Sequence, residues 1–253
     1  MLRSLEDLHG YTIHATDGDI GTVHAFFFDD KTWAMRYLVV DTGTWLPDRQ
    51  VLISPIALGQ PDWEGQFFPV KLTAEQVRNS PDIDTEQTVS RLHEIELHKH
   101  YPWTHYWAGG LWAGGIGTTG MMVGGAEPVE EHLEEDPEGA GPEKKSHLRS
   151  FDNLRGYMIH ETDGHIGEVA DLIVDDASWK IDFLVVDTGT WLPGKKVLLA
   201  PHLITDLDWM TSMVTVNASK DKIKHSPEYD QNNLVTEEYQ KKLNEYYGDS
   251  THG

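Results

Sequence analysis

Short apolar runs separated by turn signals fill the first part of the chain and predict β-strands. The strings GYTIHA, GDIGTVHAFFFDD, WAMRYLVVD, QVLISP and QFFPVKL are rich in β-branched and aromatic residues. Asp17-Gly18 supplies the positive φ of a tight hairpin, and Gly21 follows where a bulge would bend the strand. Five short strands joined by tight turns are typical of a small β-barrel.

The pattern becomes helical after the last of these strands. Thr73 and Gln76 have the spacing of a capping box, and Leu72 with Val77 would staple the first turn. Pro81 ends this short helix. A second, amphipathic helix is predicted further along the chain.

The same pattern returns 146 positions later, without a gap from Ser4/Ser150 to Tyr101/Tyr247. From Ser4 to Pro55 about half of the aligned residues are identical. The string LVVDTGTWLP occurs in both halves, and Gly167 repeats Gly21. The chain is therefore expected to be mainly β, with two barrels related by internal duplication and short C-terminal helices on each.

The second helix of each repeat carries an apolar and aromatic face that is a candidate packing or interaction surface. Its residues are His93, Leu97, His100 and Tyr101 in the first repeat and Tyr239, Leu243, Tyr246 and Tyr247 in the second. These helices are expected to join the two barrels as a pseudo-symmetric pair.

The segment between the repeats has a different composition. Residues 102–149 are first rich in glycine and tryptophan and then acidic with proline, which is typical of a solvated linker. The predicted domains are thus residues 1–101, 102–149 and 150–253. An alternative interpretation is that the aromatic part is a loop that contacts a membrane surface through Trp103, Tyr106, Trp107, Leu111 and Trp112.

Composition removes several classes of function. The formal net charge is −22, which disfavours nucleic acid and anionic lipid as partners. The chain has no cysteine, so it has neither disulfides nor thiolate metal sites, which suits a cytoplasmic protein. The first residues lack the apolar core of a signal peptide, and no long apolar run predicts a membrane-spanning helix.

The repeated Asp-Thr-Gly raises the question of catalysis. Asp41 and Asp187 would be the paired carboxylates of an aspartic hydrolase, one acting as base and the other as acid. Such enzymes also need a matching apolar-apolar-Gly segment in each half. Leu58-Gly59 fits in the first half, but Ile204-Thr205 stands at the corresponding place in the second.

The alternative to catalysis is that the two Asp-Thr-Gly motifs have a structural role in turns. Asp41 and Asp187 would accept hydrogen bonds from turn amides, while Gly43 and Gly189 adopt positive φ. The repeat predicts that the two aspartates lie at equivalent places in separate barrels, too far apart to share a proton.

Histidines offer a second candidate site. His93, His98, His100 and His105 lie close together in the sequence, and imidazole is a common metal ligand. Since His93 and His100 align with packing tyrosines, and the others lack a recognised ligand spacing, no dedicated metal site is predicted. His14 and His160 recur in register and are interpreted as barrel residues. No phosphate loop, serine elbow or paired glutamate motif occurs.

Taken in order, GYTIHATDGDIGTVHAFFFDD, the RYLVVDTG strand, VLISP and the later Asp62-Trp63 pair before the last strand resemble the PRC-barrel family, which is named for the cytoplasmic domain of the photosynthetic reaction-centre H subunit. The resemblance covers roughly residues 4–72 and 150–218, and VSRLHEIELHKHYPW is similar to the helical tails of stand-alone bacterial members. It implies a small barrel used for protein contacts, with no catalytic residues and no cofactor.

The expected function is therefore a non-enzymatic protein-binding or assembly module, whose partner is another protein or a second copy. Two alternatives stay open. One is an accessory subunit of a photosynthetic or other electron-transfer complex, and the other is the aspartic hydrolase.

Overall fold

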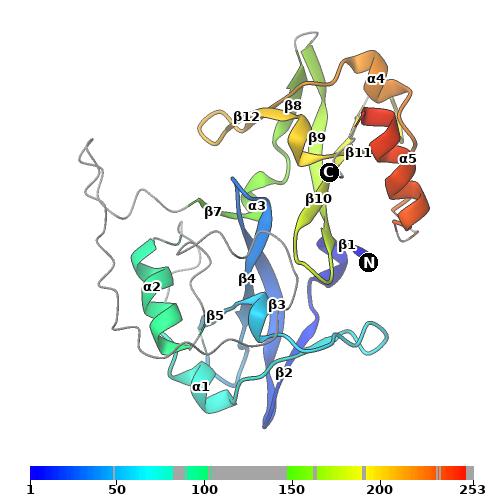
Figure 1. Cartoon of the computed structure of the whole chain (residues 1–253). Helices are drawn as coiled ribbons and strands as arrows, with labels where there is room; N and C mark the ends of the chain where they lie inside the picture. Colours follow the sequence, from blue (N-terminus) through cyan, green and yellow to red (C-terminus); the bar gives the residue numbers. More distant parts are fainter. Residues whose placement is uncertain are drawn as a thin grey trace, which may run out of the picture.

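The computed structural model shows two mixed β-sheets with short helices beside them (Figure 1). It describes residues 1–47, 49–81, 89, 91–101, 103, 147–161, 164–189, 192–231, 233 and 235–248. Most of the predicted linker, including Tyr106, Trp107, Leu111 and Trp112, and also His105, lies outside the described residues.

The first sheet has six strands in the order β5-β4-β3-β2-β6, with β7 paired to β3. Its strands are β2 (Thr12–Ala15), β3 (Gly18–Asp29), β4 (Ala34–Asp41), β5 (Gln50–Ile53), β6 (Phe67–Pro69) and β7 (Leu148–Ser150). Strands β2 to β6 confirm the five that the sequence predicts for the first repeat. All neighbours are antiparallel except β2 and β6, which run parallel.

The second sheet has seven strands in the order β11-β10-β9-β8-β13-β12, with β1 paired to β9. Its strands are β1 (Leu2–Ser4), β8 (Met158–Glu161), β9 (Gly164–Asp175), β10 (Ile181–Asp187), β11 (Lys196–Leu199), β12 (Ile204–Asp208) and β13 (Met213–Val216). Residues 58–62 of the first repeat align with β12 but form no strand, because Gly59 and Pro61 disfavour one. Only isolated bridges remain there, from Leu58 to Val70 and from Asp62 to Phe67.

The two sheets exchange a strand with each other. Strand β1, at the start of the first repeat, pairs with β9 of the second sheet, and Leu2 lies opposite Asp175. Strand β7, at the start of the second repeat, pairs with β3 of the first sheet, and Leu148 lies opposite Asp29. Each of these pairs maps onto the other through the 146-residue offset. We call β1 and β7 the exchanged strands.

A direct backbone contact between β4 and β10 completes the junction. Ala34 bridges Lys180, the Met35 amide donates to the Trp179 carbonyl at 2.8 Å, and the Ile181 amide donates to the Trp33 carbonyl at 2.7 Å. The two halves therefore contact each other, as a pseudo-symmetric pair requires.

The strand pairing does not close either sheet into a barrel. In the described residues β5 and β6 lie at opposite ends of the first sheet, and β11 and β12 lie at opposite ends of the second. Short 3₁₀ turns η2 (Pro55–Ala57) and η4 (Pro201–Leu203), each opened by proline, follow β5 and β11. The observed architecture is mainly β with two mixed sheets, and the predicted barrel closure is not found.

The helices are short and lie at the sides of the sheets. They are η1 (Glu6–Leu8), α1 (Ala74–Arg78), α2 (Arg91–His100), α3 (Phe151–Leu154), α4 (Lys220–Lys224) and α5 (Glu237–Tyr247). The capping box of Thr73 and Gln76 forms as predicted, with the Gln76 amide donating to Thr73 Oγ1 at 3.2 Å. Figure 1 shows α1 and α2 beside the first sheet and α4 and α5 beside the second.

The apolar core extends from one repeat into the other. Leu2 and Leu148 are both buried in it, so the exchanged strands contribute side chains as well as hydrogen bonds. Leu148 and Arg149, which the sequence assigned to the linker, lie in β7. The exchange therefore begins before the predicted start of the second repeat.

Candidate functional site

The first Asp-Thr-Gly motif lies in the turn that follows β4. The Asp41 carboxylate accepts a hydrogen bond from the Gly43 amide at 2.8 Å, and Gly43 has a φ of 55°. The Thr42 hydroxyl contacts the carbonyls of Leu46 and Arg49, both at 2.6 Å. The polar groups of Asp41 and Thr42 therefore stabilise the loop in which they lie.

The second motif repeats this network after β10. The Asp187 carboxylate accepts from the Gly189 amide at 2.8 Å. The Thr188 hydroxyl contacts the carbonyls of Leu192 at 2.9 Å and Lys195 at 2.7 Å. Asp41 and Asp187 belong to different sheets, and no hydrogen bond or ion pair joins them in the described part of the chain.

Each loop is also tied to a helix end by a cation. The Arg49 guanidinium donates to the carbonyls of Arg78, at 2.6 Å, and Ser80. In the second repeat the Lys195 ammonium donates to the carbonyls of Lys224 at 2.7 Å and Ser226 at 3.0 Å. Cations at these places offset the unsatisfied carbonyls at the C-termini of α1 and α4.

The predicted helical face is partly buried, and the polar contacts of His100 and Tyr246 lie within their own repeats. Leu97 and Tyr101 are 1% exposed, and Leu243 is fully buried. His100 contacts the Gln76 carbonyl at 2.8 Å, and the Tyr246 hydroxyl donates to the Lys222 carbonyl at 2.6 Å. The contacts between the halves that the structure shows run through the exchanged strands, and the role of these helices in joining the barrels stays a prediction.

The other members of this face show the same arrangement. His93 is half-buried, and the Tyr239 hydroxyl donates to the Pro227 carbonyl at 3.1 Å. Burial raises the pKa of Tyr247 and of Tyr101 to about 12 each. These phenols therefore stay protonated at neutral pH.

A buried polar cluster lies under α2 in the first repeat. The Tyr37 hydroxyl donates to Glu94 Oε1 at 3.3 Å and lies 2.8 Å from His98 Nε2. Glu94 is fully buried and His98 is 6% exposed. Trp103 stacks on Tyr101 with ring centroids 4.3 Å apart and meets His98 edge-on. The described end of the aromatic segment thus contacts this helix.

The residues of the second repeat that align with Tyr37, Glu94 and His98 all differ from them. Phe183 stands for Tyr37, Gln240 for Glu94 and Asn244 for His98. The sequence predictions left this cluster out because His98 was considered only as a metal ligand, together with residues at a recognised ligand spacing. Because all three positions differ together between the aligned repeats, a comparison of the repeats could have identified this cluster from the sequence.

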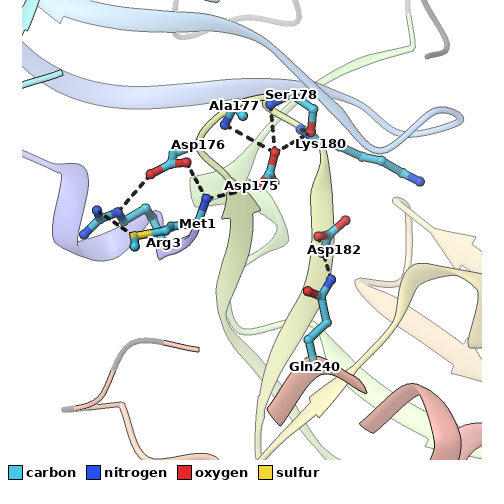
Figure 2. Close-up of polar contacts among 9 residues, drawn as sticks. All are labelled: Met1, Arg3, Asp175, Asp176, Ala177, Ser178, Lys180, Asp182 and Gln240. Atoms are coloured by element: carbon cyan, nitrogen blue, oxygen red, sulfur yellow. Dashed lines mark hydrogen bonds and ion pairs between the residues drawn. The ribbon is translucent and has the colours of Figure 1, made fainter. Parts of the chain in front are cut away.

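Charged pairs surround the exchanged strands. The Met1 amino group lies between Asp175 and Asp176, and Arg3 contacts the same Asp176 (Figure 2). The distance from the Met1 nitrogen to Asp176 Oδ1 is 2.6 Å. On the other side of the junction, Arg149 contacts Asp30 at 3.0 Å. Arg3 and Arg149 are equivalent residues, and so are Asp176 and Asp30.

Tryptophans cover these arginines. The Arg3 guanidinium lies 4.0 Å from the ring centre of Trp63, and that of Arg149 lies 5.0 Å from Trp209. The Trp209 indole also donates to Asp30 at 3.0 Å. Stacking and the ion pairs fix the position of each exchanged strand.

A half-buried carboxylate, that of Asp171, holds β1 in the second sheet. Asp171 accepts hydrogen bonds from the Ser4 hydroxyl at 2.5 Å and the Glu6 amide at 3.2 Å. Burial raises the pKa of Asp171 despite these bonds. Burial likewise raises the pKa of Asp182, which accepts from Gln240 at 3.3 Å in Figure 2.

Two classes of site are absent from the described residues. They contain no group of three or more histidines, aspartates or glutamates arranged to hold a metal ion. None of their helices combines the length and the apolar composition needed to cross a membrane.

Comparison with known proteins adds one distant relative. An "Uncharacterized protein" of Deinococcus radiodurans is 33% identical over 82 residues, which are 32% of this chain. The match spans 29% of that relative's length. No family model matches the chain.

Proposed function

We propose that the chain is a non-enzymatic protein-binding and assembly module, built from two PRC-type units that arose by internal duplication. The observation that carries the proposal is the exchange of β1 and β7, in which each sheet accepts a strand from outside its own repeat. Addition of a strand to a sheet is a general mode of protein recognition, because backbone hydrogen bonds supply affinity and side chains supply register.

The Asp-Thr-Gly motifs support the same proposal. A catalytic pair needs two carboxylates within hydrogen-bond reach of each other or of a shared water. Asp41 and Asp187 instead bond to Gly43 and Gly189 in turns of different sheets. We assign these four residues a structural role in the turns and none in catalysis.

The chemistry of the partner follows from charge. The formal net charge of −22 disfavours nucleic acid and anionic lipid and favours a protein with a basic surface. The cysteine-free composition suits a cytoplasmic setting. An accessory role in an electron-transfer complex rests on the family resemblance alone.

The test isolates the tagged full-length chain from its native cells under mild crosslinking. The proposal predicts a complex larger than one chain, with one or a few proteins at a fixed ratio to it. A control assay measures peptide cleavage at acid pH by the wild type and by Asp187→Asn. A free chain whose peptidase activity disappears in folded Asp187→Asn would replace the module with a hydrolase.

A further inference from the structure

Two histidines face each other across the β8–β9 hairpin of the second repeat. His160 and His165 are cross-strand neighbours in the antiparallel register. Their ring centroids are 5.3 Å apart, and the rings are inclined at 59°. One ion bonded to two imidazoles at about 2 Å separates the nitrogens by at most about 4 Å, so this pair is close enough for a shared ion after small ring rotations.

The pair lies on the outer face of the sheet. Ile159 and Ile166 are fully buried, so the adjacent His160 and His165 point away from the core. His165 is exposed, whereas the Nε2 atom of His160 is buried and makes no hydrogen bond to any described residue. A buried ring nitrogen without a partner is costly unless it binds something, and a metal ion is one way to satisfy it.

Thioethers flank the histidines. Met158 precedes His160 by two residues on β8 and therefore lies on the same face of the sheet. It is 45% exposed, and Met213 on β13 lies directly beside it in the parallel register. Met213 is half-buried, so the exposed Met158 gains little from packing, because burial is what stabilises an apolar side chain.

The first repeat does not have this combination. His14, the counterpart of His160, lies 3.5 Å from the Asp19 carboxylate and stacks on Phe67 with centroids 4.3 Å apart. Thr12 and Phe67 occupy the places of the two methionines. The imidazole of the first repeat thus has an aromatic and acidic environment, while that of the second lies beside His165 and shares its strand face with Met158.

The donor set determines the metal. Imidazole binds several first-row ions, but thioether sulfur is a soft ligand that favours copper(I). The chain has no cysteine, so no thiolate within it competes for this ion. We propose that His160 and His165 form a copper(I) site on the outer face of the second sheet, with the Met158 thioether as a third ligand.

The test titrates the full chain, without oxygen, into the copper(I)–bicinchoninate complex and follows loss of its colour. The wild type should withdraw one copper ion per chain. His165→Asn should weaken binding by about 10-fold or more, since loss of even an outer-shell partner of a metal ligand has an effect of this size. His165 and Met158 are exposed, so these changes leave the core intact, and circular dichroism checks the fold.

Matched variants decide the assignment. His14→Asn, at the equivalent place in the first repeat, should bind copper as the wild type does. Met158→Leu should weaken copper(I) while leaving zinc affinity unchanged, because zinc does not depend on the thioether. Equal copper binding by the wild type and His165→Asn would contradict the proposed site. A preference for zinc over copper(I) that Met158→Leu does not alter would contradict it as well.

Discussion

Ala34 bridges Lys180, the residue that occupies the equivalent place 146 positions later. A contact between equivalent residues lies on the axis of a two-fold arrangement. The reciprocal bonds of Met35 with Trp179 and of Ile181 with Trp33 obey the same symmetry. The exchanged strands also make contacts at positions 146 residues apart, since Leu2 lies opposite Asp175 and Leu148 lies opposite Asp29.

The first prediction concerns Gly21, which lies beside the Asp-Thr-Gly loop. A Cβ at Gly21 would lie 2.1 Å from the Asp41 carbonyl oxygen, a backbone atom that cannot rotate away. Gly21→Ala should reduce the free energy of unfolding by at least about 3 kcal/mol, at or above the usual range for overpacking.

Gly10→Ala is the matched control for this prediction. Gly10 has a φ of +77°, but a Cβ there would meet nothing within 4 Å. Only the left-handed backbone is penalised, so the expected loss is about 1 kcal/mol. Chemical denaturation of both variants measures the difference, and equal losses would refute the steric explanation.

The second prediction uses two aspartates near β1 whose pKa values shift in opposite directions. Burial raises the pKa of Asp171, so its ionisation destabilises the fold as pH rises from about 3.8 through the folded-state value. Asp171→Asn removes this cost and can still accept a hydrogen bond. Relative to the wild type, the variant should gain stability as pH increases from 3.8 toward neutrality.

Asp175→Asn should show the reverse dependence. Burial alone would raise the pKa of Asp175, but hydrogen bonds from Ser178 outweigh it and hold the pKa below its ordinary value. Its stabilisation is present above about pH 3.8 and is lost as pH falls through the folded-state pKa. Urea denaturation of both variants between about pH 3 and 7 measures these dependences, and parallel curves would contradict the assignment.

The third prediction concerns the cluster under α2. Tyr37→Phe removes the hydroxyl that contacts both Glu94 and His98, and buried polar atoms that lose a partner cost about 1–3 kcal/mol. Adding Glu94→Gln and His98→Asn copies the second repeat and should recover part of the loss. A triple variant whose loss equals the sum of the single losses would show that the three residues act independently.

The sequence was sufficient for the local elements. Alternating apolar residues and Asp-Gly turns predicted strands β2 to β6, and register shifts beside Gly21 and Gly167 confirm the expected bulges. The capping box of Thr73 and Gln76 also forms as predicted. These features depend on neighbouring residues, so local pattern is enough to find them.

Contacts between residues far apart in the sequence could not be predicted from local sequence pattern. The string Leu2-Arg3-Ser4 is too short to show strand periodicity, and its partner lies about 170 residues away at Ile173–Asp175. The cluster of Tyr37, Glu94 and His98 likewise depends on how α2 packs against β4. Barrel closure was expected from the short strands, their tight turns and the family resemblance, whereas pairing in the described residues leaves the ends of both sheets apart.

The most direct test of the exchange uses engineered disulfides in this cysteine-free chain. Ser4 lies opposite Ile173 of the second sheet, and the equivalent residue of the first sheet is Phe27. Antiparallel neighbours of this kind lie within the Cα separation of about 4.4–6.8 Å that a disulfide requires.

The measurement compares Ser4→Cys/Ile173→Cys with Ser4→Cys/Phe27→Cys after mild oxidation, on non-reducing gels with mass spectrometry of the linked peptides. Reciprocal exchange within one chain predicts an intramolecular disulfide between positions 4 and 173 and none between 4 and 27. A disulfide between 4 and 27 without one between 4 and 173 would place β1 in its own repeat and contradict the account.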